Sequence, residues 1–270
     1  MYEAKDKVFL ITGGVAGIGR GVVTAFLEER AKHVAILDID VKGGAAAESE
    51  LASKYGADKV KFYKCDVTTN ELTAAFDKVV EALGYIDAVV NCAGIMNDKV
   101  YEKSIAINVT AVVTSSFKAY ELMRKDRGGK GGTIVNIASI AALKPIHLLP
   151  VYSATKSAVL SFSMTLGHEP VYSRTGVRVI TLCFGCTNTE LLNTKPDVFD
   201  SENKDTLFKA IAVTPMQRID SAVKGLMDAY KKGNSASTWL ATRDRPAQDI
   251  SEDITEAYNV MKMKHGIYRT

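Results

Sequence analysis

The sequence lacks the features that would place the protein in a membrane or on a nucleic acid. No stretch of its 270 residues approaches the roughly 18 uninterrupted apolar residues of a membrane-spanning helix. The first residues, MYEAKDKVFLIT, mix acidic and basic side chains before a short apolar run, unlike a secretory signal. A net charge of +3, spread along the chain, is too small for a nucleic-acid-binding surface. We therefore expect a cytoplasmic protein with no stable membrane insertion and no nucleic-acid partner.

Cysteine and histidine are also scarce, with four residues of each type. A chain of this length can bury an ample core, so it does not need a framework of disulfides. Cys183-x-x-Cys186 has the spacing of half a zinc site, but the sequence holds no second such pair, and the histidines have no ligand spacing. We expect buried thiols and no metal.

Short apolar runs alternate with helical patterns along the chain. The expected strands are 7–12, 33–38, 59–67, 86–91, 131–139, 176–185 and 237–241, and the expected helices are 18–30, 43–55, 70–83, 100–125, 151–174 and 218–232. Apolar strands that alternate with helices are typical of a parallel sheet covered on both faces. No linker or repeat divides the chain. The pattern predicts one α/β domain over residues 1–270, a doubly wound Rossmann fold with a parallel sheet of about seven strands.

Residues 190–216 depart from this alternation. The segment is polar, contains Pro196 and Pro215, and shows no clear helical or strand period. It directly follows the carboxyl end of an expected strand, and ligands bind at that end in open α/β sheets. We therefore expect a substrate lid, with an ordinary surface loop as the alternative.

A glycine-rich turn, TGGVAGIGRG at 12–21, joins the first strand to the first helix. Gly13, Gly17 and Gly19 permit a tight turn and a close approach of the backbone to a ligand. The amide groups and dipole at the start of the following helix favour a pyrophosphate. Because no Gly-Lys-Ser/Thr ends the turn, a Walker phosphate loop is excluded, and a dinucleotide site is predicted.

Asp38 ends the second strand, 38 − 19 = 19 residues after the last glycine of that turn. A carboxylate at this place accepts hydrogen bonds from ribose hydroxyls and repels a 2′-phosphate. Ile39 rather than a basic residue follows it, and Lys42 is the only nearby cation that could soften the repulsion. These residues predict NAD rather than NADP as the cofactor.

Six motifs occur in a fixed order along the chain. They are T-G-x-x-x-G-x-G at 12–19, Asp-Val at 66–67, N-x-A-G at 91–94, Asn108, Ser139, and Y-x-x-x-K at 152–156. In this set of motifs the sequence resembles the short-chain dehydrogenase/reductase family, over residues 5–245. The segment LCFGCTNTELL and the length resemble the branch of NAD-dependent 15-hydroxyprostaglandin dehydrogenases and insect alcohol dehydrogenases.

The resemblance implies four catalytic residues. Tyr152 would be the general base in alcohol oxidation and the general acid in ketone reduction. Lys156, one helical turn on, would lower the pKa of that phenol and hold the nicotinamide ribose. Ser139 would bind the substrate oxygen, and Asn108 would hold a water linking Lys156 to solvent. Taken singly, each has an ordinary structural explanation, such as a snorkelling lysine beside a half-buried tyrosine.

The cofactor contacts that the turn, the strand ends and the resemblance imply lie at strand ends, in turns and on the catalytic helix. They are Gly13, Val15, Gly17, Ile18, Gly19, Asp38, Ile39, Asp66, Val67, Asn91, Ala93, Gly94, Tyr152, Lys156, Gly185, Thr187 and Thr189. Two residues depart from the family pattern. Cys92 replaces a usual asparagine and should be tolerated, whereas Phe184 replaces a usual proline and puts the shape of the pocket in doubt.

The sequence therefore predicts an NAD-dependent oxidoreductase that interconverts a lipophilic secondary alcohol and its ketone. The expected apolar pocket residues are Leu143, Ile146, Leu148, Leu149, Phe184 and Met216, although the leucines could equally be core or oligomer contacts. The alternative is a catalytically idle NAD-binding redox sensor or scaffold. A Ser139/Lys156 hydrolase is excluded, because no G-x-S-x-G surrounds the serine. Helices 100–125 and 151–174 carry more apolar surface than one sheet face needs, which predicts a homodimer or homotetramer.

Overall fold

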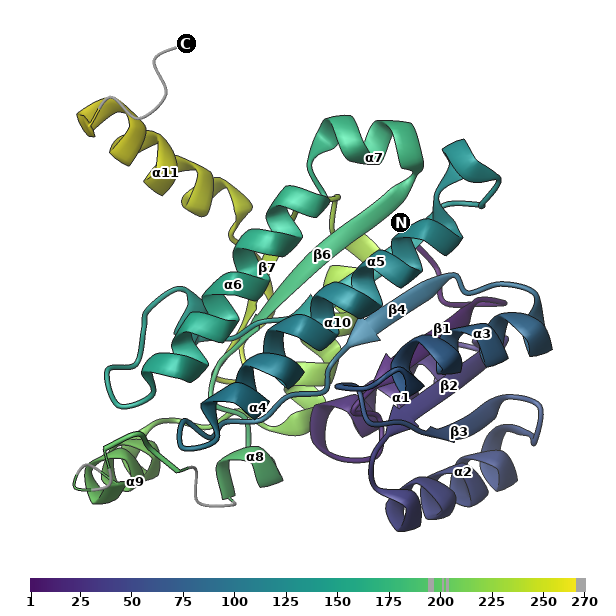
Figure 1. The fold of residues 1–270 in the computed structure, drawn as a ribbon, viewed down its shortest axis with the longest axis horizontal. Helices are drawn as coiled ribbons and strands as arrows, with labels where there is room; N and C mark the ends of the chain where they lie inside the picture. The colour runs from purple at the N-terminus through teal and green to yellow at the C-terminus, as the bar shows by residue number, and fades with distance from the viewer. Residues whose placement is uncertain (194–196, 201, 203, 266–270) are drawn as a thin grey trace.

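Eight strands form one sheet at the centre of the molecule (Figure 1). The structure is a computed structural model, and it describes residues 1–193, 197–200, 202 and 204–265. The strands are β1 (Val8–Thr12), β2 (His33–Asp38), β3 (Val60–Lys64), β4 (Ala88–Asn91), β5 (Gly132–Ile137), β6 (Val177–Phe184), β7 (Thr238–Ala241) and β8 (Gln248–Asp249). Their order is β3-β2-β1-β4-β5-β6-β7-β8, and all neighbours are parallel except β7 and β8. The predicted doubly wound fold is confirmed, and the short antiparallel β8 adds to it.

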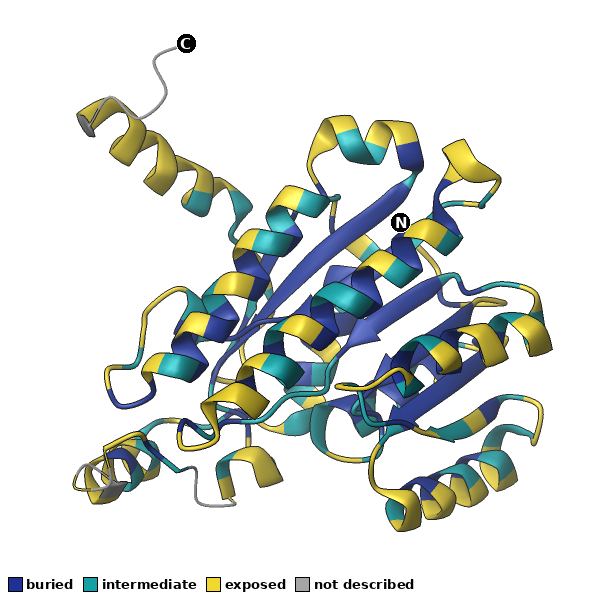
Figure 2. Cartoon of the chain, viewed as in Figure 1, coloured by how far each residue is buried: buried dark blue, intermediate teal, exposed yellow. Residues whose placement is uncertain are grey.

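Helices cover both faces of this sheet. One face carries α1 (Gly17–Glu28), α2 (Val41–Tyr55) and α10 (Ile219–Lys232), and the other carries α3 (Glu71–Leu83), α5 (Ala111–Met123) and α6 (Pro150–Leu166). The strands between them are buried along their whole length in most of the sheet (Figure 2). Two-sided burial explains why the strands read as continuous apolar runs rather than as alternating ones.

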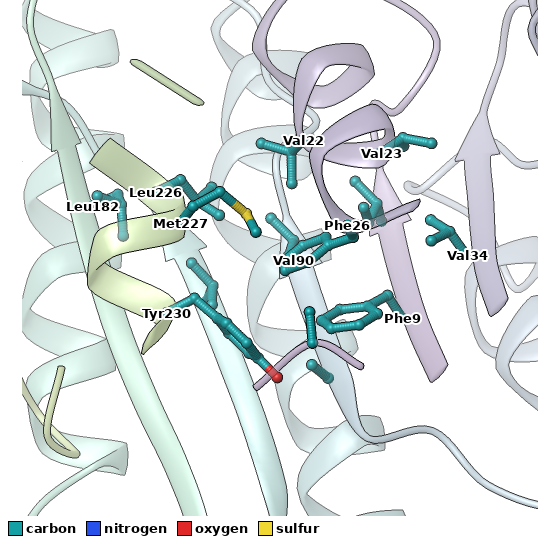
Figure 3. Close-up of a cluster of buried hydrophobic side chains, with 14 of the residues drawn as sticks. Phe9, Val22, Val23, Phe26, Val34, Val90, Leu182, Leu226, Met227 and Tyr230 are labelled. Carbon is teal, nitrogen blue, oxygen red and sulfur yellow. The ribbon is translucent and has the colours of Figure 1, made fainter. Parts of the chain in front are cut away.

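Adjacent residues of one strand supply the cores on the two faces. In β1, Phe9 points to the α1 and α10 side, while Leu10 points to the α3 and α5 side. The ring of Phe9 stacks on Phe26 with centroids 3.8 Å apart, and Tyr230 packs edge-on against Phe26 at 5.3 Å (Figure 3). This aromatic cluster fixes α1 and α10 against the sheet, so it also fixes the glycine-rich turn that precedes α1.

Two expected long helices are interrupted. Residues 100–125 form α4 (Tyr101–Ile105), a π-helical turn η1 (Ala106–Thr110) and α5. Residues 151–174 form α6 and α7 (Glu169–Thr175), because a proline inside one continuous helix would remove a backbone hydrogen bond and clash with the carbonyl four residues earlier, whereas Pro170 is tolerated in the first turn of α7. A uniform apolar pattern does not reveal either break.

The region beyond the carboxyl ends of the strands is covered by short helices. It holds α4, α8 (Glu190–Asn193) and α9 (Lys204–Val213), so the expected lid 190–216 is partly helical in its described residues (Figure 1). The sheet order reverses between β1 and β4, which are neighbours although β2 and β3 lie between them in the chain. Such a reversal opens a crevice at the strand ends, where ligands bind in this class of fold.

Candidate active site

A cavity of 530 Å³ lies at this crevice. Most of the predicted site residues line it: Gly13, Gly17, Ile18, Gly19, Asp38, Ile39, Asp66, Val67, Ala93, Gly94, Ser139, Tyr152, Lys156, Gly185, Thr187 and Thr189. Three predicted residues, Val15, Asn91 and Asn108, do not line the cavity. The chain therefore brings residues from six strand ends to one space.

Bare backbone forms the floor of the cavity at the β1–α1 turn. Gly13 has a φ of +68°, and a Cβ at this position would lie 2.8 Å from the backbone of Ala93. A Cβ at Gly19 would lie 2.0 Å from the Gly13 carbonyl oxygen. The Thr12 hydroxyl joins the ends of β1 and β4 by accepting hydrogen bonds from the amides of Cys92 and Ala93, at 3.1 and 3.2 Å. A side chain at either position would collide with this backbone, so glycine allows the turn to fold tightly against the end of β4 and leaves its backbone exposed to the cavity.

The Asp38 carboxylate is held in place at the end of β2. One oxygen accepts a hydrogen bond from the Val15 amide at 3.1 Å, and the other accepts one from the Asp40 amide at 3.2 Å. Val15 therefore stands behind the carboxylate rather than in the cavity wall. Ile39, 60% exposed, follows it. The arrangement presents a negative charge beside an apolar surface at one end of the cavity.

Asp66 follows β3 and closes the same end. Its carboxylate accepts hydrogen bonds from the Thr68 hydroxyl at 2.7 Å and the Thr68 amide at 2.9 Å. These bonds hold the pKa of Asp66 below its usual range. The side chain is therefore a fixed acceptor at neutral pH.

Tyr152 and Ser139 meet at the other end of the cavity. Tyr152 lies in the first turn of α6 and is 7% exposed, and Ser139 follows β5. Burial raises the pKa of Tyr152 to about 12, although the contact with the Ser139 hydroxyl lowers it. This differs from the expectation that Lys156 sets a lowered pKa, because removal of the phenol from water outweighs the nearby groups.

Lys156 lies one turn beyond Tyr152 on α6. Its Nζ donates a hydrogen bond to the Ile137 carbonyl oxygen at 2.9 Å and lies 5.8 Å from the centre of the Tyr152 ring. Burial lowers the pKa of Lys156 to about 8. The side chain is thus mostly protonated at pH 7 and loses its proton at about pH 8, within electrostatic reach of the phenol.

Burial of the Lys156 charge predicts a pH-dependent stability difference between Lys156→Met and the wild type. The folded protein binds the lysine proton more weakly than the unfolded chain does. Burial of the charge therefore lowers the free energy of unfolding by its full amount below pH 8, and this loss vanishes above pH 10.5. Between pH 7 and 10 the wild type should gain about 2–3 kcal/mol of unfolding free energy relative to the variant, at about 1.4 kcal/mol per pKa unit. Urea unfolding at several pH values measures this. The exposed Lys42→Met should give a flat difference, and a flat difference for Lys156→Met would contradict the expectation.

Asn108 supports the site from behind. Its side chain accepts a hydrogen bond from the Ile95 amide at 2.9 Å and donates to the Ile95 carbonyl oxygen at 2.8 Å. A Cβ on Gly94 would lie 3.2 Å from Asn108 Oδ1 and 3.6 Å from Lys156 Nζ, so both side chains converge on this glycine. The π-helical turn η1 carries Asn108, and such turns are frequent at functional sites. Its role in holding a water stays a prediction.

Asn91 lies beneath the cavity. Its side-chain nitrogen donates to Asn136 Oδ1 at 2.8 Å and to Ser116 Oγ at 3.2 Å. Asn136 in turn donates to Ser163 at 2.9 Å, on α6. Asn91 therefore belongs to a buried polar network that joins β4 and β5 to α5 and α6, and its side chain does not reach the predicted cofactor surface.

Asp98 is a site residue that the sequence did not reveal. Its carboxylate is 1% exposed and accepts hydrogen bonds from the amides of Val151 at 2.8 Å and Tyr152 at 3.0 Å. It thereby caps α6 from 54 residues away in the sequence. An aspartate directly before a helix would have been a sequence signal, but this one comes from the segment after β4.

Asp98→Ala should impair both stability and turnover. Loss of two hydrogen bonds to a buried charge should cost about 2–4 kcal/mol of unfolding free energy. Because the first turn of α6 carries Tyr152, displacement of that turn should lower kcat about ten- to a hundredfold. Urea unfolding and steady-state kinetics measure these effects. Asp40→Ala, which removes the exposed cap of α2, is the control and should leave kcat unchanged. Equal behaviour of the two variants would argue against a role for Asp98 in placing Tyr152.

The expected lid covers the Tyr152 end of the cavity. Leu191, Leu192, Leu207 and Ile211 line the cavity from α8 and α9. Ile146, Leu149 and Phe184 line it too, whereas Leu148 packs just behind, Leu143 is 38% exposed and Met216 is not in the wall. The walls near Tyr152 are therefore largely apolar.

The two ends of the lid are joined at its base. Thr187 and Gln217 form a parallel β-bridge. The side-chain Nε2 of Gln217 donates hydrogen bonds to the Thr187 hydroxyl at 2.9 Å and to the Ala241 carbonyl oxygen at 3.0 Å. The Thr187 hydroxyl donates to the Gly185 carbonyl oxygen at 3.0 Å. Gln217 thus fixes the loop after β6 that carries the predicted cofactor contacts.

The described residues contain no cluster of three or more His, Cys, Asp or Glu side chains that could hold a metal. All four cysteines are free thiols. In the part of the chain that the structure describes, no helix is both long enough and apolar enough to cross a membrane.

Known proteins are similar to this chain in sequence. Residues 7–198 match the family described as short chain dehydrogenase. The 15-hydroxyprostaglandin dehydrogenase (NAD+) of Macaca fascicularis is 36% identical over 191 residues, which are 70% of this chain and 71% of that protein. Alcohol dehydrogenase 1 of Ceratitis cosyra is 35% identical over 191 residues, covering 70% of this chain and 72% of its own length.

Solved structures share the fold. Levodione reductase superposes with a TM-score of 0.74 at 24% identity, covering 88% of this chain and 97% of its own. The 3-ketoacyl-(acyl-carrier-protein) reductase of Brucella melitensis, complexed with NADH, gives a TM-score of 0.74 at 23% identity with the same coverage. With the family match over most of its length, the chain belongs to the short-chain dehydrogenase/reductase family of oxidoreductases acting on CH–OH groups.

Proposed function

We propose that this protein is an NAD-dependent dehydrogenase that interconverts a lipophilic secondary alcohol and its ketone. The observation that carries the proposal is the convergence of Ser139, Tyr152 and Lys156 on one cavity that also reaches Asp38. The similarity to 15-hydroxyprostaglandin dehydrogenase (NAD+) supports the choice of cofactor. A homodimer or homotetramer and a cytoplasmic location stay predictions.

The residues present fit a nicotinamide dinucleotide. The glycine cradle of the β1–α1 turn would take the pyrophosphate, with Asp38 at the adenosine ribose and Asp66 and Val67 beside the adenine. Lys156 would hold the nicotinamide ribose, and Thr187 and Thr189 would bond the carboxamide. When bound, the cofactor accepts or donates the hydride. The protein supplies orientation and proton transfer.

Proton transfer would fall to Tyr152. Its raised pKa keeps the phenol protonated at neutral pH, as the proton donor in ketone reduction must be, but it also makes the phenol a weaker acid. For oxidation the phenolate needs stabilisation. Lys156 Nζ lies 5.8 Å from the centre of the Tyr152 ring, and opposite charges at about that separation attract by about 3 kcal/mol at an effective dielectric constant of 20, or about two pKa units. Ser139 would hold the substrate oxygen beside Tyr152.

The apolar walls predict how activity depends on substrate. In a series of secondary alcohols lengthened by one methylene at a time, kcat/KM should rise about fourfold per buried methylene, from about 0.8 kcal/mol each. Absorbance of the reduced cofactor, with NAD or NADP, measures this. Small polyols are the control and should react poorly. A kcat/KM that does not change with chain length would contradict the proposal of a lipophilic substrate. No turnover with any alcohol, despite binding of NADH, would favour the alternative of a catalytically idle NAD-binding protein.

A further inference from the structure

Helix α11 (Ser251–His265) projects from the body of the molecule (Figure 1). Its start is anchored to β7, because the Thr238 amide donates to Ser251 Oγ at 2.9 Å and the Ile250 amide donates to the Thr238 carbonyl oxygen at 2.8 Å. Beyond Ile254, every described side chain of the helix is exposed (Figure 2). An isolated helix of 15 residues is marginally stable in water, so α11 needs a packing partner.

One side of α11 carries an apolar stripe. Ile254, Ala257, Tyr258 and Met261 follow the i, i+3, i+4, i+7 spacing that places side chains on one helical face. Tyr258 and Met261 are 50% and 45% exposed, so the described body of the chain leaves the stripe open. Met263, 78% exposed, lies on the opposite face of the helix.

The charges of α11 are divided between its two halves. Glu252, Asp253 and Glu256 lie in the first half, and Lys262 and Lys264 lie in the second. Asp253 and Lys264 are 264 − 253 = 11 residues apart, about three turns, so they flank the stripe on the same side. When two such helices pack antiparallel about a two-fold axis, equal flanks face each other. Each Asp253 then meets Lys264 of the other copy.

We propose that the apolar stripe of α11 packs antiparallel against the same stripe of a second copy of this chain, with the two-fold axis near Tyr258. The stripe is self-complementary. In each of the two symmetry-related contacts, the acidic half of one helix faces the basic half of the other. An anionic membrane surface fits less well, because the acidic half would be repelled. A helix about 22 Å long buries less than the 1,200 Å² of a stable dimer, so α11 should reinforce a wider assembly or pair weakly. The inference does not depend on the catalytic proposal.

Disulfide crosslinking of the full chain tests the pairing. Ala257→Cys adds a thiol beside the axis, and Met263→Cys adds one on the far face. Under mild oxidation at micromolar concentration, Ala257→Cys should form a covalent dimer at least tenfold faster than Met263→Cys. The unmodified chain, with its four native thiols, measures the background. Equal rates for the two variants, or no crosslinking above background, would overturn the proposal.

A charge exchange tests the antiparallel orientation. In the Ala257→Cys background, Asp253→Lys places like charges together at both ends and should slow crosslinking at least fivefold. Adding Lys264→Asp should restore the rate to within twofold. A double variant as slow as the single one would refute the antiparallel arrangement. Sedimentation of the unmodified chain with phosphatidylserine vesicles, abolished by Met261→Glu, would show that a lipid surface covers the stripe instead.

Discussion

Tyr152→Phe should bind NADH as tightly as the wild type and turn over about a thousandfold more slowly. The substitution removes one hydroxyl from a side chain that is otherwise buried among apolar neighbours, so the fold and the dinucleotide surface should stay intact. A positioned general acid or base contributes about 10²–10⁴ to a rate, which sets the size of the loss. Fluorescence titration with NADH and steady-state kinetics in both directions measure the two quantities.

Tyr230→Phe is the matched control. Its hydroxyl is also buried and makes a 3.3 Å hydrogen bond to the Glu3 carbonyl oxygen, but it lies in the aromatic cluster between α10 and β1. Its activity should stay near that of the wild type. If Tyr152→Phe keeps more than a tenth of the activity, Tyr152 is not the proton-transfer residue. If it loses NADH binding too, the defect lies in the pocket rather than in the chemistry.

Asp38→Asn should shift the preference for NADP over NAD, measured as the ratio of the two kcat/KM values, by about 10²–10³. At about 4 Å, two unit charges repel by about 4 kcal/mol at an effective dielectric constant of 20. Each 1.4 kcal/mol is a factor of ten. Asparagine keeps an oxygen that can accept the Val15 amide, so the turn should hold its shape. The repulsion toward a 2′-phosphate is what the variant removes.

The neighbouring Asp40→Asn controls for a general change of charge. Asp40 caps α2 by accepting a hydrogen bond from the Gly43 amide at 3.0 Å, and it is solvent-exposed. Solvent screens exposed charges strongly, so this variant should change the ratio only a few-fold. An unchanged ratio for Asp38→Asn would mean that another group, with Lys42 the first to test, decides between the cofactors.

Local patterns were sufficient for most of the sheet. The run HVAILD predicts β2 at its observed bounds, because a strand buried on both faces must be apolar throughout. The break before Pro170 could have been predicted from the proline alone, because proline is tolerated in the first turn of a helix and not in its interior. The π-helical turn around Asn108 could not, because its side chain bonds to the Ile95 backbone across the fold.

The candidate site shows the same division. Residues on glycine-rich turns and at strand ends, such as Gly13 and Asp38, can be predicted from the residues next to them in the sequence. Asp98 and Gln217 act through backbone groups 54 and 24 residues away, so only the folded chain shows what they hold. Asn91 was expected at the surface of the cavity and lies below it, where its side-chain nitrogen donates to Asn136 Oδ1 on the neighbouring strand. The pKa of Tyr152 likewise depends on how deeply the phenol is buried, and the four-residue spacing of Tyr152 and Lys156 in the sequence does not show this.

The bridge between Thr187 and Gln217 has an evolutionary consequence. Because the base of the expected lid is closed by its own hydrogen bonds, the two ends of segment 190–216 stay in place when the residues between them change. Doubling a flexible loop costs only about 0.6 kcal/mol of closure entropy. Insertions and replacements there can change the apolar walls of the cavity, while Ser139, Tyr152 and the glycine-rich turn, which lie on other elements, are inherited unaltered. Substrate range and reaction chemistry can thus diverge at separate rates within one chain.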